Sequence, residues 1–444
     1  MVKKKMKTVS AEIKKLGING EGIAYLDKKI TFVQGALPTE TVEIEIERDE
    51  KTYKIGKLVK VEVPSEHRVQ PKCYQQGKCL GCPLMIMDYP SQLEHKNQFI
   101  KDTFNKYAEI DLSRIDYQSI KASAQQYGVR GIARLPISKF KDRLVFGIYQ
   151  RDSKYLSLMK SCPMQSTKIN KCLGDLEKLF NDMHLQAYDD MKKRGLRFLY
   201  VREFDEGIQL IFITGEDRLP ERVLDAISKL DYVASIYVSV NTSRHQDFEL
   251  QRYEKKYGKT NMEQYFMQQK FIISSKADFP VYRQHAVRVA KEIANIVNKK
   301  SQKLIELNCG IGLYSLGLDK EIEIKGIDNS RININDAMNN VHFMKRENAD
   351  FEYGRIEKIF PILAKTHKYD TLLFHINEAK VSSELIQNIR ISKLNQVVLV
   401  SDHISTLAKV VGDLKDRYQI SKVMSFDGSP CGPNATVICQ LDCR

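Results

Sequence analysis

The chain has 444 residues, of which 42% are hydrophobic and 28% charged, and its formal net charge at pH 7 is +14. This length is enough for two or three domains, each with its own core. No apolar run reaches the roughly 20 residues of a membrane span, so we expect no membrane partner. The excess of cationic residues favours a polyanionic partner, because lysines and arginines that neutralise phosphates release bound counterions. A lysine-rich composition without such a partner is the alternative.

The start of the chain and its cysteines indicate the compartment. Residues 1–5, Met-Val-Lys-Lys-Lys, lack the apolar stretch that a signal peptide needs. Nine cysteines, an odd number spread over the chain, argue against a disulfide scaffold and for reducing surroundings. We therefore expect a cytoplasmic protein. The sequence does not fix the oligomeric state, and we expect a monomer.

Residues 1–65 predict a small β-barrel. Apolar and charged residues alternate over residues 41–48, as in a strand with one buried face, and glycines mark the turns of the segment. Small barrels with basic surfaces commonly bind RNA. The lysines of the N-terminal tail are candidate phosphate contacts, with a solvated tail as the alternative: Lys3, Lys4, Lys5 and Lys7.

Four cysteines suggest a metal centre. Cys73, Cys79 and Cys82 form a C-x5-C-x2-C run. Cys162 follows a strand-like segment that can fold back onto them. Thiolates this close in sequence can converge on one metal centre, whereas structural cysteines of a core have no fixed spacing. Four thiolates suit either a [4Fe–4S] cluster or a tetrahedral zinc ion, and unrelated core cysteines are the alternative.

Residues 66–265 predict a mixed α and β domain. A linker at residues 64–71 leads into the cysteines. Helical patterns cover residues 89–107 and 169–183, and strand patterns cover residues 134–137, 144–148 and 209–213.

Strands and helices alternate over residues 266–444, which predicts a doubly wound parallel sheet. A helical pattern at residues 281–297 precedes a short buried strand at residues 303–307. Further strand patterns lie at residues 324–328, 371–374, 396–400 and 435–439.

A nucleotide site is predicted where the first two of these strands end. Glu306 lies near the end of one strand, and Asp328 ends the next. Gly310 and Gly312 form a G-x-G turn between them that we expect to open a helix. Glycines let a backbone approach its ligand, and an acid in this place accepts hydrogen bonds from ribose hydroxyls. The absence of a third spaced glycine fits S-adenosylmethionine, which has no pyrophosphate, better than a dinucleotide; an empty glycine turn is the alternative.

Barrel, cysteines and nucleotide fold in this order resemble the RNA uracil-5-methyltransferases, which modify ribosomal or transfer RNA. Residues 20–24 and 32–38 look like the N-terminal TRAM barrel of this family, and residues 65–68 resemble the approach to its iron–sulfur loop. Residues 306–312, Glu-Leu-Asn-Cys-Gly-Ile-Gly, are similar to its D-L-Y-C-G-x-G cofactor motif. The resemblance spans nearly the whole chain.

The resemblance implies a fold and a set of site residues. The fold would be an OB-like TRAM β-barrel, a mixed α+β central domain with an iron–sulfur cluster, and a Rossmann-like class I methyltransferase domain. The four cysteines would be the ligands of a structural [4Fe–4S] cluster, which the resemblance favours over zinc. Arg130 and Arg202 lie in segments that resemble the RNA-facing central domain. The implied partner is a structured RNA, ribosomal or ribosome-associated.

Two positions that carry the chemistry of this family differ here. Family members add a cysteine thiolate to C6 of uracil, methylate C5, and remove the C5 proton with a general base. Asp402 stands in the place of that cysteine, and Thr436 stands in the place of the glutamate base. A carboxylate is a far poorer nucleophile toward this carbon, and threonine does not accept a proton near neutral pH. The resemblance therefore implies that uracil methylation is lost.

Two binding motifs depart as well. Residues 375–378, which begin with His375, replace the family's D-P-P-R, and residues 278–280 replace its F-F-Q. Arg355 follows a glycine where an acid usually lies near the adenine. Cys431 lies in the loop that normally carries the base, and we consider it as a substitute nucleophile, with an ordinary loop thiol as the alternative.

The sequence therefore predicts an RNA-binding member of this family without uracil-C5 chemistry, which chaperones, masks or helps to assemble a structured RNA during rRNA processing. The alternative is an active S-adenosylmethionine-dependent RNA methyltransferase, of the kind that acts on 23S rRNA, with altered chemistry. The retained acids and glycines of the nucleotide site favour that alternative.

Overall fold

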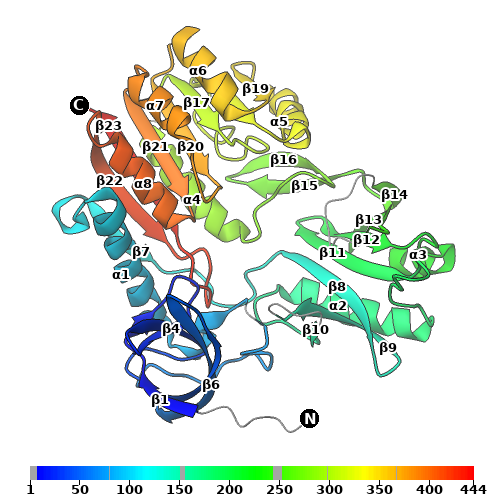
Figure 1. Ribbon diagram of the computed structural model, residues 1–444. Helices are drawn as coiled ribbons and strands as arrows, with labels where there is room; N and C mark the ends of the chain where they lie inside the picture. The colour runs from blue at the N-terminus through cyan, green and yellow to red at the C-terminus, as the bar shows by residue number, and fades with distance from the viewer. Residues whose placement is uncertain (1–7, 80, 151–155, 244–252, 298, 367) are drawn as a thin grey trace. The chain divides into compact units, whose positions relative to one another are not determined.

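The computed structural model describes residues 8–79, 81–150, 156–243, 253–297, 299–366 and 368–444 (Figure 1). The chain forms two compact units. The first comprises Met1–Phe99, Tyr149–Ser157 and Ser429–Ala435, and the second comprises Ile100–Ile148, Leu158–Gly428 and Thr436–Arg444. No helix in the described ranges combines the length and the apolar character needed to cross a bilayer.

The first unit is built on a curled sheet with the strand order β1-β5-β6-β4-β3-β2 (Figure 1). In β5 the side chains of Val42 and Ile44 point inward and are fully buried, because alternate residues of a strand face opposite sides. This confirms the strand predicted from alternating residues. The strands are β1 (Thr8–Glu12), β2 (Lys15–Leu16), β3 (Gly22–Leu26), β4 (Lys29–Gln34), β5 (Thr41–Asp49) and β6 (Tyr53–Val63).

A buried ion pair joins the barrel to the segment after it. Arg68 donates from Nη2 to Oε2 of Glu40 at 2.8 Å and to the carbonyl of Gly35 at 2.7 Å. Burial alone would raise the pKa of Glu40, but hydrogen bonds from Arg68 and from two backbone N–H groups hold it below its ordinary value. The short 3-10 helix η1 (Pro83–Ile86) adds Leu84 and Ile86 to a small apolar cluster with the barrel. Helix α1 (Tyr89–Ala108) follows.

The middle of the chain forms a sheet in the second unit, with neighbouring strands in the order β9-β8-β11-β12-β13-β14. Two amphipathic helices, α2 (Thr167–Asp182) and α3 (Glu221–Ser228), pack their apolar sides on it, with Phe180 and Val223 fully buried. The strands are β8 (Ile132–Phe140), β9 (Arg143–Tyr149), β11 (Leu196–Phe204), β12 (Gly207–Thr214), β13 (Val233–Val240) and β14 (Glu254–Gly258), and the short β10 (Leu156–Leu158) lies at the boundary of the two units.

The C-terminal part of the second unit is a large sheet with the order β19-β18-β17-β20-β21-β23-β22-β7. The first five strands in this order, from β19 through β18, β17 and β20 to β21, run parallel to one another, and β23 is antiparallel to β21. The strands are β7 (Tyr117–Lys121), β17 (Lys303–Leu307), β18 (Glu323–Asp328), β19 (Ala349–Tyr353), β20 (Thr371–Ile376), β21 (Gln396–Ser401), β22 (Tyr418–Phe426) and β23 (Thr436–Cys443). The other elements are η2 (Leu112–Arg114), the hairpin β15 (Asn261–Phe266) and β16 (Gln269–Ser274), and the helices α4 (Arg283–Val297), α5 (Arg331–Met344), α6 (Ile356–Thr366), α7 (Ser383–Ile391) and α8 (Ile404–Leu414).

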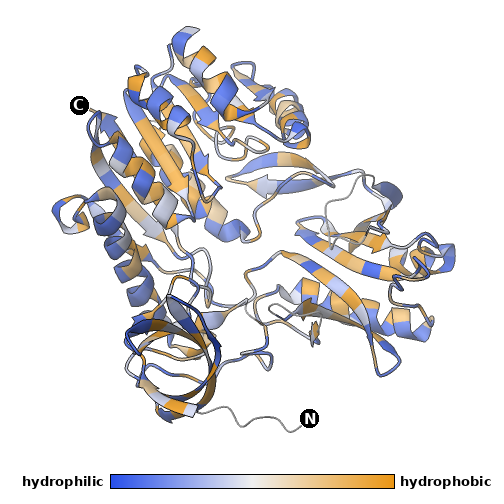
Figure 2. Ribbon diagram, in the orientation of Figure 1, coloured by the Kyte–Doolittle hydropathy of each residue, from blue (hydrophilic) through white to orange (hydrophobic). Residues whose placement is uncertain are grey.

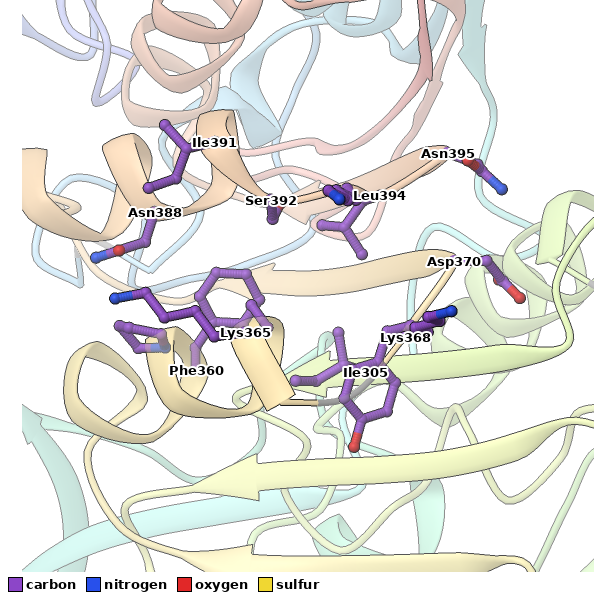
Figure 3. A pocket seen from close by; sticks show the side chains of 14 residues that line it. Ile305, Phe360, Lys365, Lys368, Asp370, Asn388, Ile391, Ser392, Leu394 and Asn395 are labelled. Atoms are coloured by element: carbon purple, nitrogen blue, oxygen red, sulfur yellow. The ribbon is translucent and has the colours of Figure 1, made fainter.

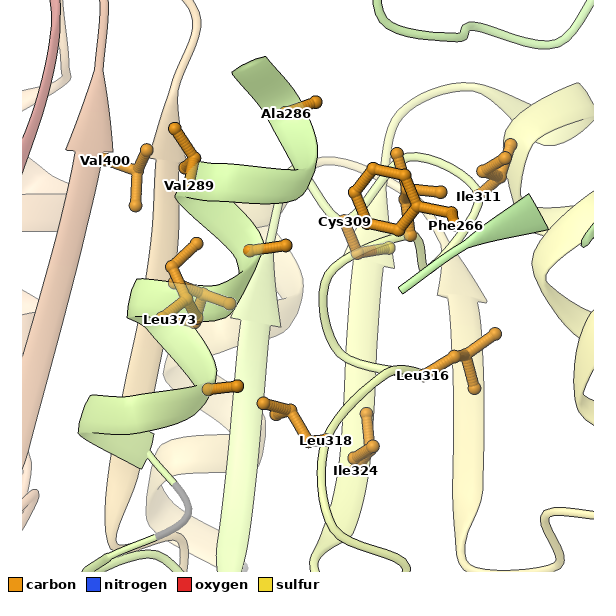
Figure 4. Packing of buried hydrophobic residues seen from close by; sticks show 14 of the residues in the cluster. Phe266, Ala286, Val289, Cys309, Ile311, Leu316, Leu318, Ile324, Leu373 and Val400 are labelled. Carbon is orange, nitrogen blue, oxygen red and sulfur yellow. The ribbon is translucent and has the colours of Figure 1, made fainter. Parts of the chain in front are cut away.

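Helices cover both faces of this sheet. Every residue of β20 and β21 is buried, as is usual for parallel strands covered on both sides, and the central strands are largely apolar (Figure 2). On one face, Ala286 and Val289 of α4 pack with Leu373 of β20 and Val400 of β21 (Figure 4). This arrangement confirms the predicted Rossmann-like α/β fold.

One predicted element is wrong. Residues 310–317 form consecutive turns rather than a helix after the G-x-G motif. The left-handed φ angles of Gly310 and Gly312, 56° and 72°, interrupt a regular helix. The following carbonyls bond instead to the buried guanidinium of Arg346, which donates to the carbonyls of Leu316, Leu318, Asp319 and Ile322.

Candidate functional site

The predicted nucleotide turn lies at the carboxyl end of β17. A Cβ added to Gly312 would lie 2.8 Å from Cζ of Phe351, so only glycine packs there without displacing that ring. A Cβ added to Gly310 would meet no atom within 4 Å. Gly310 therefore serves the backbone conformation and faces open space, whereas Gly312 serves both conformation and packing.

Asp328 holds this turn. Its Oδ2 accepts a hydrogen bond from the N–H of Gly310 at 2.9 Å, and its Oδ1 accepts one from the N–H of Ser330 at 2.8 Å. The structure thus brings the predicted residues of two neighbouring strands together. A carboxylate has about four lone-pair positions, so each oxygen of Asp328 retains capacity for a further donor.

Glu306 is fully buried beside the turn. Its Oε1 lies 2.8 Å from Nε2 of His375, and the ring of Tyr314 lies 4.7 Å from that imidazole ring, centroid to centroid. Its Oε2 is buried and has no hydrogen-bond partner in the structure. A buried carboxylate oxygen without a partner is costly, so this atom is a candidate ligand contact. We call Glu306, His375, Gly310 and Asp328 the cofactor network.

A second group of polar side chains lies at the end of the neighbouring strand β21. The hydroxyl of Thr436 donates to Oδ1 of Asp402. His285 of α4 lies with its Nε2 2.8 Å from the same hydroxyl oxygen. Because the single hydroxyl proton is directed to Asp402, the imidazole nitrogen is the donor in this second contact. We call Asp402, Thr436 and His285 the acceptor network.

Burial is the main influence on His285. It lowers the pKa of the imidazole, against the opposing charges of Asp402 and Asp427 and with a smaller contribution from Arg288. His285 is therefore neutral near pH 7, which agrees with a single N–H on Nε2. Sequence reasoning missed this residue, because its partner Thr436 lies 151 positions away and no local motif marks it.

The other departing motifs are placed as follows. His375 belongs to the cofactor network, and Asp278 accepts a hydrogen bond from Nδ2 of Asn333 at 3.0 Å. Arg355 is exposed, with its Nε 3.7 Å from a carboxylate oxygen of Glu357. Of these former motif residues, only His375 contacts a predicted cofactor residue.

The predicted metal ligands lie in different units. Cys73, Cys79 and Cys82 belong to the first unit, Cys162 belongs to the second, and all four are partly buried. Among the residues that the structure describes, no group of three or more His, Cys, Asp or Glu side chains is placed to hold a metal ion. The iron–sulfur cluster therefore stays a prediction.

Arg202 corrects a predicted RNA contact. Its side chain is 1% exposed. The guanidinium donates to the carbonyls of Ser274, Ser275 and Ala277 at 2.8–3.1 Å, so it fastens the β15–β16 hairpin to β11. A phosphate has no access to it.

The remaining predicted RNA contacts are untested. Arg130 is partly buried, and its backbone exchanges hydrogen bonds with Met164 and Ser166. The N-terminal lysines lie outside the described residues: Lys3, Lys4, Lys5 and Lys7.

Cys431 does not fit the role of a substitute nucleophile. It is 1% exposed, and its backbone is held inside the first unit. Its N–H donates to Oε1 of Gln92 at 3.1 Å, and its carbonyl accepts from the N–H of Leu84 at 3.0 Å. A nucleophilic thiol needs solvent access and surroundings that stabilise the thiolate.

Known proteins share this architecture over its whole length. A model of the TRAM domain matches residues 2–59. A protein of Enterococcus faecalis named as an uncharacterized RNA methyltransferase is 28% identical over 99% of this chain and 98% of its own length. A protein of Clostridium tetani with the same description is 28% identical over 96% of this chain and 94% of its own length. The chain is thus similar over nearly its whole length to proteins named as RNA methyltransferases.

A solved structure supports the fold. The tRNA (uracil-54, C5)-methyltransferase of Pyrococcus abyssi, solved in complex with S-adenosyl-L-homocysteine, superposes with a TM-score of 0.77 and 23% identity. The superposition covers 98% of this chain and 100% of that one. At this identity the likeness shows a common fold, which combines the TRAM barrel with a Rossmann-like methyltransferase sheet.

Proposed function

We propose that this protein binds RNA, keeps a site for S-adenosylmethionine and has lost methylation of uracil C5. The hydrogen bond from Thr436 to Asp402 is the observation that carries the proposal. Uracil-C5 chemistry needs a thiolate in the first position and a proton acceptor in the second. Asp402 supplies no sulfur, and the hydroxyl of Thr436 has its proton committed to Asp402 and its oxygen to His285.

The number of altered catalytic positions supports complete loss of uracil-C5 methylation rather than a slower reaction. A nucleophile and a general base each contribute on the order of several kcal/mol to lowering a barrier, and residues that act as a unit fail together. Both positions are altered here. The remaining neutral imidazole of His285 donates its Nε2 proton to Thr436, so this nitrogen is not available as a base.

The cofactor network suits S-adenosylmethionine. Glu306 offers a buried, unpartnered oxygen to a cationic amino group, Asp328 retains acceptor capacity for ribose hydroxyls, and Gly310 faces open space. When bound, this cofactor supplies an electrophilic methyl group. The chain's own residues would bind and orient it and, at Glu306, balance its positive charge.

The same residues favour a second candidate, an RNA methyltransferase that acts on an atom other than uracil C5. Retention of the cofactor network is the observation in its favour. Methyl transfer to an intrinsically nucleophilic atom needs neither a covalent adduct nor removal of a ring proton, so loss of the thiol and the carboxylate would not abolish it.

The barrel supports RNA binding. Tyr25 and Tyr53 are 53% and 38% exposed, and Lys57 and Lys60 of β6 are exposed as well. Exposed aromatic rings and lysines on the surface of one barrel can bind single-stranded RNA by stacking and by phosphate contacts. The partner that we propose is a structured, ribosome-associated RNA in the cytoplasm.

The decisive experiment combines cofactor titration with mass spectrometry of RNA. We expect the purified protein to bind S-adenosylmethionine calorimetrically and to form no 5-methyluridine on ribosomal or transfer RNA. The variant Asp402→Cys/Thr436→Glu is the matched control for a restored nucleophile and base. Any 5-methyluridine made by the unmodified protein contradicts the loss of chemistry. A different methylated nucleoside supports the second candidate, and failure to bind the cofactor removes both candidates that rely on it.

We also propose, from the cysteine spacing together with the resemblance to the RNA uracil-5-methyltransferases, that the protein holds a [4Fe–4S] cluster. Anaerobically purified protein would then absorb near roughly 400 nm and contain iron and sulfide. Cys79→Ser should remove this absorbance, whereas Cys443→Ser should keep it. Iron-free protein with four accessible thiols would contradict the cluster.

A further inference from the structure

A cavity of about 750 Å³ opens between α6 and α7 in the second unit (Figure 3). It lies where β20 and β21 begin, near Asp370 and Asn395, whereas Asp328 and Asp402 lie where strands of the same sheet end. The cavity is therefore at the opposite edge of the sheet from both networks described above. Its volume is in the range of sites that hold small molecules and cofactors.

The floor of this cavity is apolar. Ile305, Phe360 and Leu394 are buried and line it, and Ile391 of α7 lies at its rim with 61% of its surface exposed.

 Ile391 is thus an exposed apolar side chain next to an apolar floor, and a planar apolar ring placed in the cavity would remove the exposed surface of Ile391 from water. Burying such surface from water stabilises a bound ligand by about 25 cal/mol per Å².

Three of the polar groups around the opening are cationic. Lys365, Lys368 and Lys393 line the cavity and are exposed, and none of the three forms an ion pair in the described structure. Lys365 of α6 and Asn388 of α7 lie on opposite sides of the opening (Figure 3). Three lysines around one concave opening attract an anion.

Asp370 is the one carboxylate among the described lining residues, and its oxygens are bonded to groups other than these lysines. Asp370 accepts hydrogen bonds at Oδ1 from the hydroxyls of Ser301 and Thr371, both at 2.8 Å. It accepts at Oδ2 from the N–H groups of Gln302 and Lys303, again at 2.8 Å. Its lone pairs are therefore committed to the start of β17 and β20 rather than to the lysines.

We propose that this cavity binds a nucleotide, with its base over the apolar floor and its phosphate at the three lysines. The combination of an apolar floor and a cationic rim selects a ligand that is both planar and anionic. Two sources share this chemistry, a free nucleoside monophosphate and an unpaired nucleotide of a bound RNA. The cavity is separate from the cofactor network, so a negative result for nucleotide binding here would leave the proposed function unaffected.

The test uses the full-length protein and three probes, which are adenosine 5′-monophosphate, a five-nucleotide single-stranded RNA and inorganic phosphate. Calorimetry or fluorescence anisotropy gives the affinities. We expect saturable binding of the mononucleotide or of the short RNA, at least tenfold tighter than that of phosphate. Binding of the mononucleotide identifies a free nucleotide as a sufficient ligand, and binding of the short RNA alone identifies the RNA.

Charge-matched variants separate this cavity from general attraction. The variant Lys365→Gln/Lys368→Gln/Lys393→Gln should weaken binding at least tenfold, and Ile391→Glu, which adds a negative charge at the rim, should weaken it as well. The control Lys291→Gln/Lys320→Gln/Lys358→Gln removes the same charge from exposed sites of the same sheet domain and should change affinity less than twofold. Absence of saturable binding, phosphate binding of equal strength, or equal loss in both triple variants would overturn the proposal.

Discussion

The cofactor network and the acceptor network lie at the ends of neighbouring parallel strands, yet they differ in what they leave open. In the cofactor network, Oε2 of Glu306 has no partner and Gly310 faces empty space. In the acceptor network, the hydroxyl of Thr436 both donates to Asp402 and accepts from His285. One network keeps capacity for a ligand, whereas in the other the hydroxyl of Thr436 already has a partner for its proton and a donor to its oxygen. This difference agrees with the proposed function, in which the chain binds the cofactor and lacks uracil-C5 chemistry.

The largest expected effect is on stability, and it comes from the glycine turn of the cofactor network. Gly312→Ala should lower the free energy of unfolding by about 3 kcal/mol, because it adds both a left-handed alanine and a clash with Phe351. Gly310→Ala is the matched control and should lower it by about 1 kcal/mol, since only the backbone conformation is unfavourable. Urea unfolding measures both, and equal losses would show that the clash is relieved.

Breaking the acceptor network should have a smaller effect. Thr436→Val removes the hydroxyl between Asp402 and His285 and should lower the free energy of unfolding by about 1.5 kcal/mol. Thr436→Ser keeps the hydroxyl and should stay within about 0.5 kcal/mol of the unmodified protein. Neither variant should alter the affinity for S-adenosylmethionine. A change in that affinity would mean that the two networks are coupled.

A conservative change in the cofactor network should affect binding more than stability. Glu306→Gln keeps the shape of the side chain but removes its charge, so affinity for S-adenosylmethionine should fall about tenfold, equivalent to about 1.4 kcal/mol. Glu347→Gln, at an exposed position, is the control and should leave affinity unchanged. Calorimetric titration measures both variants. An unchanged affinity for Glu306→Gln would show that the buried oxygen does not contact the ligand.

The smallest expected effect is a dependence on pH through His285. Burial lowers the pKa of this imidazole below its ordinary value of 6.5, so below about pH 6.5 the unfolded chain binds a proton that the folded chain does not. Stability is therefore complete above that pH and decreases as the pH falls toward the folded-state pKa, by less than about 1 kcal/mol. Urea unfolding at pH 7.5 and 5.5 measures this loss. His285→Gln should show a smaller loss, and an identical loss would assign it to other groups.

Local patterns predicted the fold well where one strand or helix is decided by its own residues. The apolar runs at residues 303–307 and 396–400 are strands β17 and β21, because parallel strands buried on both faces need continuous apolar sequence. The helix after the G-x-G motif was predicted wrongly. Its carbonyls bond to Arg346, a residue more than 20 positions away that no local pattern connects to the turn.

The candidate site was harder to predict from sequence, because its contacts also join residues that are far apart in the chain. Glu306, Gly310 and Asp328 follow a local motif and do lie together. The bond between Thr436 and Asp402 spans 34 positions, and sequence could show only that the two residues are unusual. Arg202 was assigned to RNA because its segment resembles the RNA-facing central domain of the family, and the sequence of a strand does not show whether the face that carries an arginine is covered. That depends on the β15–β16 hairpin, which lies some seventy residues away.

The side chain of Arg346 has a consequence for how the domain assembles. Its guanidinium supplies the donors for four carbonyls between residues 316 and 322, a stretch that has no helical ladder of its own. Because Arg346 follows the end of α5, these four hydrogen bonds tie the stretch to that end of the helix. Amides of residues 316–322 should accordingly exchange with deuterated solvent whenever the end of α5 detaches.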